Sequence, residues 1–205
     1  MLKAMEVGYV LHSAQSQYQL PFCKFLRYIQ YIPQTGDLVI ATVHHSSADL
    51  YHCLITPHTP PASLPHLSFE GANRKTRPHL VNGSLVYARV ANASKHADPE
   101  LECVHPSTNK AEGLGPLKGG MTFDVSLGFA RRLMAGKKGG IIILDELAQH
   151  APFEAAVGKN GRVWINGGDN LKVTLGVGRA LLEADEKGLT VTEQKKMIER
   201  ILKGR

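Results

Sequence analysis

The chain has 205 residues, and 43% of them are hydrophobic, which is enough to build a core and excludes an intrinsically disordered chain. Lysine and arginine total 24 while aspartate and glutamate total 18, so the net charge is +6 and the isoelectric point is about 9.3. A basic chain of this kind is typical of nucleic-acid-binding proteins, although other basic proteins bind acidic protein partners.

The first 30 residues contain strand-like pieces with no clear boundary between them. We expect residues 1–30 to be the remnant of an N-terminal domain, or a strand that leads into the next unit. They show no signal-peptide pattern, and no apolar run in the chain approaches the roughly 18 residues of a membrane span. We therefore expect a soluble intracellular protein that does not bind a membrane.

About five short strands follow, separated by turn signals. Their apolar residues alternate, as Tyr51, Cys53 and Ile55 do on one face of the second strand. An Asn-Gly turn at Asn82-Gly83 opens the fourth strand. Small closed barrels of the OB type have this number and length of strands. The segments are GDLVIATV, DLYHCLI, ASLPHLSFEG, NGSLVYARV and PELECV.

The pattern changes after residue 105. HPSTNKAEGLGPLKGG is rich in glycine, proline and polar residues, which predicts a linker or an ordered loop. From Ser126 apolar residues recur at helical spacing, with Gly136 as the expected stop. A short helix (IIILDELAQHA), two strands (PFEAAVG and GRVWI) and two longer helices follow. We predict two small domains, with an all-β unit over residues 31–105 and an α/β unit over residues 106–205.

The stretch Gly158-Lys159-Asn160-Gly161 has the G-x-x-G spacing of a KH loop, which clamps a nucleic-acid backbone. Asn-Gly is also the strongest short signal for a β-hairpin, since a type I′ turn needs positive φ at both central residues. The flanking residues are apolar and strand-forming, which favours a structural turn over a clamp with Lys159 on a phosphate. Trp164 fits a buried anchor better than a platform for a base.

A second basic element is GANRKTRPHL, which places Arg74, Lys75 and Arg77 within four positions between two barrel strands. An exposed basic loop on a barrel can follow a phosphate backbone, with an affinity that falls as salt rises. The alternative is a solvated loop that only aids solubility. Tyr51 and His66 are candidates for stacking on bases or contacting base edges, and their alternative place is the core.

Enzyme chemistry finds little support in the sequence. It contains no G-x-S-x-G, H-E-x-x-H or P-loop, and its acidic residues lack the spacing of a carboxylate pair or a magnesium site. His44-His45 is an adjacent pair, which does not place two ligands on one face of a strand or helix. Cys23, Cys53 and Cys103 are far apart, which argues against a disulfide framework and a zinc site and is consistent with a reducing compartment. We expect no catalysis, no metal and no cofactor.

Five segments carry a likeness to a known family: RYIQYIPQTGDLVIATV, ASLPHLSFEGANRKTRPHLVNGSLVYARV, PELECV, GLGPLKGGMTFDVSLGFARRLM and PFEAAVGKNGRVWI. In this order they resemble the S1–KH cap subunits of the eukaryotic RNA exosome. FEGANRKTRP and SLGFARRL favour the Rrp40 type over the other KH-bearing cap. The resemblance covers residues 27–165 closely and the C-terminal helices loosely.

The resemblance implies an S1 domain, which is an OB-type five-stranded barrel, followed by a KH-type domain with the boundaries given above. The family carries G-x-N-G where ordinary KH domains carry G-x-x-G, and Gly158 to Gly161 match it. The loop is therefore implied to be structural and packed towards the S1 domain. Family members also have an N-terminal domain of several strands, to which residues 1–26 show no match. The first barrel strands lack the glycine-and-phenylalanine pattern of RNA-binding S1 domains, for which Tyr51 and His66 are partial substitutes.

The function that the resemblance implies is that of a non-catalytic RNA-binding cap on a ring of RNase PH-like subunits, beside other S1 cap subunits. Single-stranded RNA would pass the S1 faces for 3′–5′ processing and degradation by a nuclease bound elsewhere. Arg74, Lys75 and Arg77 match the basic S1 loop that faces this path. The implied location is the nucleus, including the nucleolus, and the cytoplasm. The alternative is a structural adaptor that stabilises the ring without binding RNA.

Overall fold

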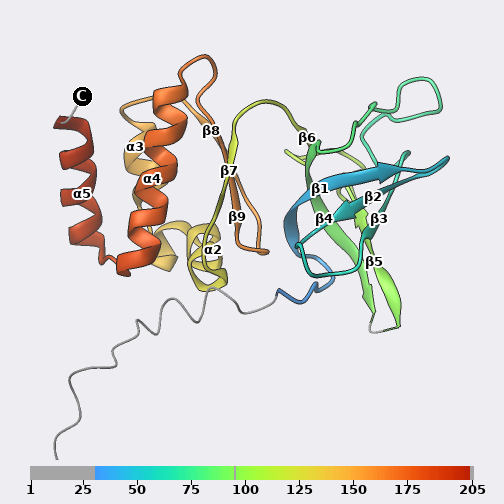
Figure 1. Ribbon diagram of the computed structural model, residues 1–205, viewed down its shortest axis with the longest axis horizontal. Helices are drawn as coiled ribbons and strands as arrows, with labels where there is room; N and C mark the ends of the chain where they lie inside the picture. The colour runs from blue at the N-terminus through green and yellow to red at the C-terminus, as the bar shows by residue number, and fades with distance from the viewer. Residues whose placement is uncertain (1–30, 95, 204–205) are drawn as a thin grey trace, which may run out of the picture.

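The computed structural model describes residues 31–94 and 96–203 (Figure 1). The prediction for residues 1–30 lies outside this part of the chain. The described residues form a β-barrel and a helix-rich unit that lie side by side. Within them, no helix combines the length and apolar character needed to cross a membrane.

The barrel closes because its first strand pairs with strands on both sides, in the order β1-β2-β3-β5-β4 and back to β1. All pairings in it are antiparallel except the short parallel contact between β3 and β5. Alternate residues point inward, as the buried Val86, Ala88 and Val90 do on β4. The predicted five-stranded barrel is confirmed. Its strands are β1 (Leu38–Ser46), β2 (Leu50–Leu54), β3 (Ala62–Pro65), β4 (Leu85–Ser94) and β5 (Ala97–Glu102).

The segment after the barrel is an ordered connection. It contains β6 (Gly115–Leu117), which pairs with β4 through Leu85–Leu117 and Tyr87–Gly115. The predicted boundary between residues 105 and 106 precedes this strand, so the connection lies on the barrel before the chain enters the second unit.

The second unit is a three-stranded antiparallel sheet, in the order β7-β9-β8, with helices on one face. The expected helix after Ser126 is confirmed, and the Ser126 side chain caps it by accepting a hydrogen bond from the backbone N–H of Phe129. The elements are β7 (Met121–Asp124), α2 (Leu127–Met134), the 3₁₀ turn η1 (Gly136–Gly139), α3 (Ile143–Ala148), β8 (Glu154–Val157), β9 (Arg162–Asn166), α4 (Leu171–Lys187) and α5 (Val191–Lys203).

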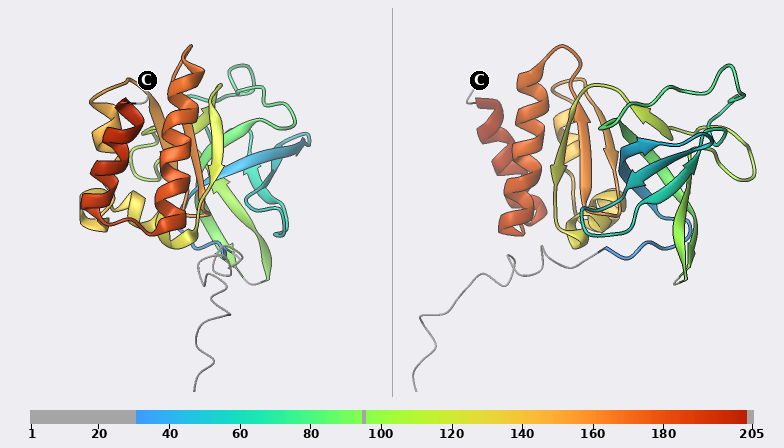
Figure 2. Two further views of the ribbon diagram at one scale, coloured as in Figure 1. Left: turned by 60° about the vertical axis from the view of Figure 1, so that its left-hand side comes forward. Right: turned by 45° about the vertical axis from the view of Figure 1, so that its right-hand side comes forward.

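The three-stranded sheet separates the helices from the barrel (Figure 2). On β9, Val163 and Ile165 point into the core formed with the helices, while Trp164 points the other way and packs with Ile40 of the barrel. All three are buried because both faces of the strand are covered. Trp164 is 4% exposed and donates from Nε1 to the carbonyl of Gly119 at 2.9 Å, so its role as a buried anchor is confirmed.

Candidate nucleic-acid interface

The basic loop between β3 and β4 is held in shape by its own hydrogen bonds. Asn73 Oδ1 accepts from the backbone N–H groups of Lys75 (2.8 Å) and Thr76 (2.9 Å), and Thr76 Oγ1 donates to the carbonyl of Gly71 at 2.9 Å. Arg74 and Lys75 are exposed, and neither has a carboxylate within ion-pair distance in the described part of the chain. Two cations are thus presented to solvent on an ordered turn.

Arg77 has a different environment from its two neighbours. It is half-buried, and its Nη1 lies 2.5 Å from Nδ1 of His66 and 3.4 Å from the carbonyl of Ala48. Arginine can only donate, so His66 Nδ1 accepts and the imidazole is neutral, with its proton on Nε2 near Ser46 Oγ at 3.3 Å. Burial, and after it the charge of Arg77, lower the pKa of His66 below its ordinary value.

The two predicted stacking residues lie beneath this loop. Tyr51 is 3% exposed and His66 is 4% exposed, and their ring centroids are 4.1 Å apart. The Tyr51 hydroxyl donates to the carbonyl of Pro78 at 2.6 Å, which ties the end of the loop to the barrel. In this arrangement both rings support the loop from below. Direct contact between these rings and RNA bases stays a prediction.

The G-x-N-G stretch forms the turn between β8 and β9, whose last pair is Val157 with Val163. In this loop Gly161 has a positive φ (+80°) while Asn160 does not, so the turn differs from the type I′ geometry on which the hairpin expectation was based. The turn is closed by a hydrogen bond from the Gly161 N–H to the Gly158 carbonyl at 3.1 Å, so Lys159 and Asn160 are its central residues and Gly161 follows them. The side chain of Asn160 points to the barrel. Its Nδ2 donates to the carbonyls of Ile40 (2.9 Å) and Ile55 (2.8 Å), and its Oδ1 accepts from the Ile40 N–H (3.3 Å).

Asn160 therefore replaces a missing strand partner for the barrel. It is 8% exposed, and its amide satisfies backbone groups of β1 and of the residue after β2 that would otherwise be unpaired. Gly158 makes this approach possible, since a Cβ there would lie 2.3 Å from Asn160 Oδ1 and 2.9 Å from the Ile40 nitrogen. In this conformation the loop faces the barrel, and its asparagine amide has no free group for a phosphate.

Charged side chains extend the same contact. Lys159 Nζ lies 2.6 Å from Asp37 Oδ1, and Asp37 Oδ2 accepts from the Tyr31 hydroxyl at 2.8 Å. Burial, and after it the hydrogen bond to Asp37, raise the pKa of Tyr31, so its hydroxyl stays a donor. Arg162 Nη1 donates to Thr42 Oγ1 at 2.9 Å. Sequence reasoning missed the links from Lys159 and Arg162 because their partners are more than 100 residues away in the chain.

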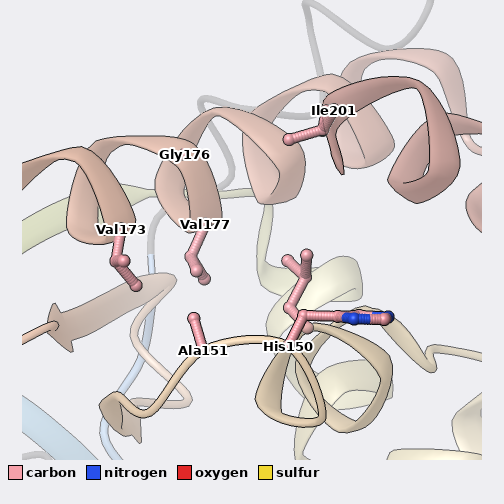
Figure 3. Close-up of a pocket in the computed structure, with 7 residues that line it drawn as sticks. His150, Ala151, Val173, Gly176, Val177 and Ile201 are labelled. Atoms are coloured by element: carbon pink, nitrogen blue, oxygen red, sulfur yellow. The ribbon is translucent and has the colours of Figure 1, made fainter. Parts of the chain in front are cut away.

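A pocket in the helical unit is lined mainly by apolar residues, which supply no catalytic group. It lies between α3, α4 and α5, where Ala151, Val173 and Val177 point toward one another and the ring of His150 points aside (Figure 3). In the described ranges, no group of three or more histidine, cysteine, aspartate or glutamate side chains is placed to hold a metal ion. The buried thiols of Cys53 and Cys103 have raised pKa values because of burial, which makes them unreactive.

Comparison with protein-family models places two domains on the chain. The model described as "Exosome complex component RRP40, S1 domain" matches residues 31–115, and a KH domain model matches residues 120–171. Both assignments agree with the barrel and with the helix-rich unit.

Several curated proteins are similar over most of the chain. Exosome complex component RRP40 of Drosophila melanogaster is 40% identical over 78% of this chain, and that of Saccharomyces cerevisiae is 37% identical over 78%. The Schizosaccharomyces pombe protein of the same name is 45% identical over 71%. The matches span 66%, 66% and 59% of these relatives, so the chain covers no more than about two thirds of their length.

A solved structure shares the architecture. A crystal structure described as an exosome complex RNA-binding protein superposes with a TM-score of 0.66 at 24% sequence identity, and covers 85% of this chain and 96% of that one. At this identity the similarity shows a shared fold.

Proposed function

Because the chain belongs to the RRP40 family of S1–KH exosome components, we propose that it is a non-catalytic, RNA-binding cap subunit of an RNA exosome. In this role its barrel guides single-stranded RNA into a ring of RNase PH-like subunits for 3′–5′ processing and degradation. The observation that carries the proposal is the ordered basic loop with Arg74 and Lys75 exposed and free of carboxylate partners.

The physical argument for RNA is electrostatic. A phosphate backbone is held by lysine and arginine side chains that are not already neutralised, and binding releases counterions. The loop offers two such side chains on a turn that its own hydrogen bonds hold, so little backbone entropy is lost on binding. Arg77 contacts His66 at the side of the loop. We assign it two roles, which are to position the loop and to contact a phosphate.

The test removes the two free charges and leaves Arg77 in place. Arg74→Ala/Lys75→Ala should weaken binding of single-stranded RNA to the assembled complex. The slope of log affinity against log salt should become shallower by up to about 1.4, at about 0.7 per phosphate contact. The matched control is Lys172→Ala/Lys196→Ala, which removes two exposed charges from α4 and α5. An unchanged affinity and slope in the loop variant would contradict the proposed RNA contact.

The second candidate is a structural adaptor that stabilises the ring by protein contacts. It is favoured by the G-x-N-G loop, whose asparagine is committed to the barrel, and by the burial of Tyr51 and His66. An adaptor would co-purify with the exosome while the loop variant leaves RNA binding unchanged.

Partners are tested by purification from the cells that make the chain, and location by fractionation of the same cells. We propose RNase PH-like ring subunits and other S1 cap subunits as partners, in the nucleus, including the nucleolus, and in the cytoplasm. Stoichiometric recovery of these subunits at moderate salt supports assembly, and their absence contradicts it.

A further inference from the structure

The end of the β1–β2 hairpin carries a pair of stacked imidazoles. A bulge after Val43 shifts the register so that His45 lies directly opposite His52. Their ring centroids are 4.2 Å apart and the planes differ by only 9°, which is a parallel stack. The sequence suggested only that adjacent histidines are poor metal ligands. It is the bulge that brings one of them against a third histidine.

The stack faces outward and is held in place. Tyr51 and Cys53, the neighbours of His52 on β2, are buried, so His52 points to the outer face of the barrel while His45 is exposed. His52 Nε2 lies 2.7 Å from Ser47 Oγ, which orients its ring. His44 meets His45 edge-on, with centroids 5.7 Å apart and planes at 81°. The result is a small aromatic surface whose rings are already ordered.

This surface adjoins the basic loop. The turn of the hairpin lies between them, since Ser47 contacts His52 while the carbonyl of Ala48 accepts from Arg77. The hairpin end and the loop both lie on the side of the barrel away from the helices (Figure 1). An RNA strand whose phosphates are bound by Arg74 and Lys75 would therefore lie next to this aromatic surface.

We propose that the His45–His52 stack is a docking site for an unpaired nucleobase of the RNA held by the basic loop. This inference rests on the proposed function and adds to it a base-stacking subsite. Bases stack on histidine as on other aromatic rings, and stacking tolerates any base because every base has a π-face. The loop would supply charge and the histidine pair would supply the flat surface, which together are the two components of single-strand binding.

The test uses the full 205-residue chain and a short single-stranded RNA that contains 2-aminopurine, whose fluorescence is quenched on stacking. His45→Ala/His52→Ala should weaken binding by about fivefold or more and restore the fluorescence of the bound probe. His45→Phe/His52→Phe should keep both affinity and quenching, because a phenyl ring stacks without hydrogen-bonding to the base. The matched control is His58→Ala/His96→Ala, which removes two exposed histidines from other barrel turns.

Salt dependence separates this subsite from the basic loop. Removal of the stack should shift log affinity by the same amount at every salt concentration, because stacking on a base neutralises no phosphate. Removal of Arg74 and Lys75 should instead make the slope shallower. If the loop variant weakens binding while the histidine variant binds and quenches like the wild type, the stacking inference is overturned and the proposed function stands. If the wild-type chain fails to bind the RNA, the stacking inference is overturned, while the proposed function is judged by RNA binding to the assembled complex.

Discussion

Arg77 donates to an imidazole that the fold keeps uncharged. His66 is buried against Tyr51, and it accepts from Arg77 through Nδ1 while Nε2 faces Ser46. Burial disfavours the charged form of this imidazole, and a proton on Nδ1 would also set a cation against Arg77, so the pKa of His66 lies below its ordinary value of 6.5. The anchor of the basic loop is therefore sensitive to acid.

The direction of that sensitivity follows from linkage. A histidine with a lowered pKa in the folded state stabilises the fold above about pH 6.5, and this contribution is lost as pH falls towards the folded pKa. The free energy of unfolding should therefore decrease more for the wild type than for His66→Asn between about pH 7.5 and about pH 5. Asparagine keeps an oxygen acceptor for Arg77 and does not titrate. Denaturant unfolding at the two pH values measures this, and equal decreases for the two proteins would contradict it.

Helix α4 packs against β7 at a point where there is no space for a side chain. A Cβ on Gly178 would lie 2.0 Å from Cζ of Phe123, whereas one on Gly176, in the same helix, would meet nothing within 4 Å. The two glycines share the same helical backbone preference, so they separate packing from propensity.

Alanine substitutions at these two positions should have opposite effects. Gly178→Ala should lower the free energy of unfolding by about 1–3 kcal/mol, because the overpacking strain exceeds the gain in helix propensity. Gly176→Ala should raise it by up to about 1 kcal/mol. Denaturant unfolding of the three proteins measures both changes, and a Gly178→Ala protein as stable as the wild type would show that the Phe123 ring moves aside at little cost.

The two domains are joined by a polar contact centred on Asn160. Its amide pairs with the backbone at Ile40 and Ile55, and Lys159 and Arg162 add contacts on either side. Around these bonds, Trp164 packs on Ile40. The barrel therefore depends on a turn of the KH domain to satisfy part of its own backbone, which should couple unfolding of the two units.

Asn160→Ala should uncouple them. The change leaves the carbonyls of Ile40 and Ile55 without their partner and should cost about 3 kcal/mol. Trp164 fluorescence reports β9 and its contact with Ile40 of the barrel, and thiol labelling of Cys53 and Cys103 reports opening of the barrel in which both are buried. With Cys23→Ser in every protein, the two transitions should coincide in the wild type and separate in the variant.

The control for this experiment is Asn92→Ala, at an exposed position on β4, which should change stability by less than about 0.5 kcal/mol and keep the transitions together. Transitions that coincide in Asn160→Ala as well would show that apolar packing alone couples the two domains.

Most of the architecture was predictable because it depends on near neighbours in the chain. Alternation of apolar residues predicted the strands of the barrel, and their helical spacing from Ser126 predicted α2. The likeness to exosome cap subunits added the order of the two domains, and the family models agree with it. These features follow from backbone preference and hydrophobic period, which act within a few residues.

The sequence by itself therefore determined a basic composition, a five-stranded barrel followed by an α/β unit, and a basic loop with Arg74, Lys75 and Arg77. Only the tertiary structure decided which polar groups are free. It turned Tyr51 and His66 inward and gave the Asn160 amide to the barrel. It also set His45 against His52. The physical reason is that exposure and hydrogen-bond partnership are properties of the packed surface, and packing joins residues whose separation along the chain carries no local signal.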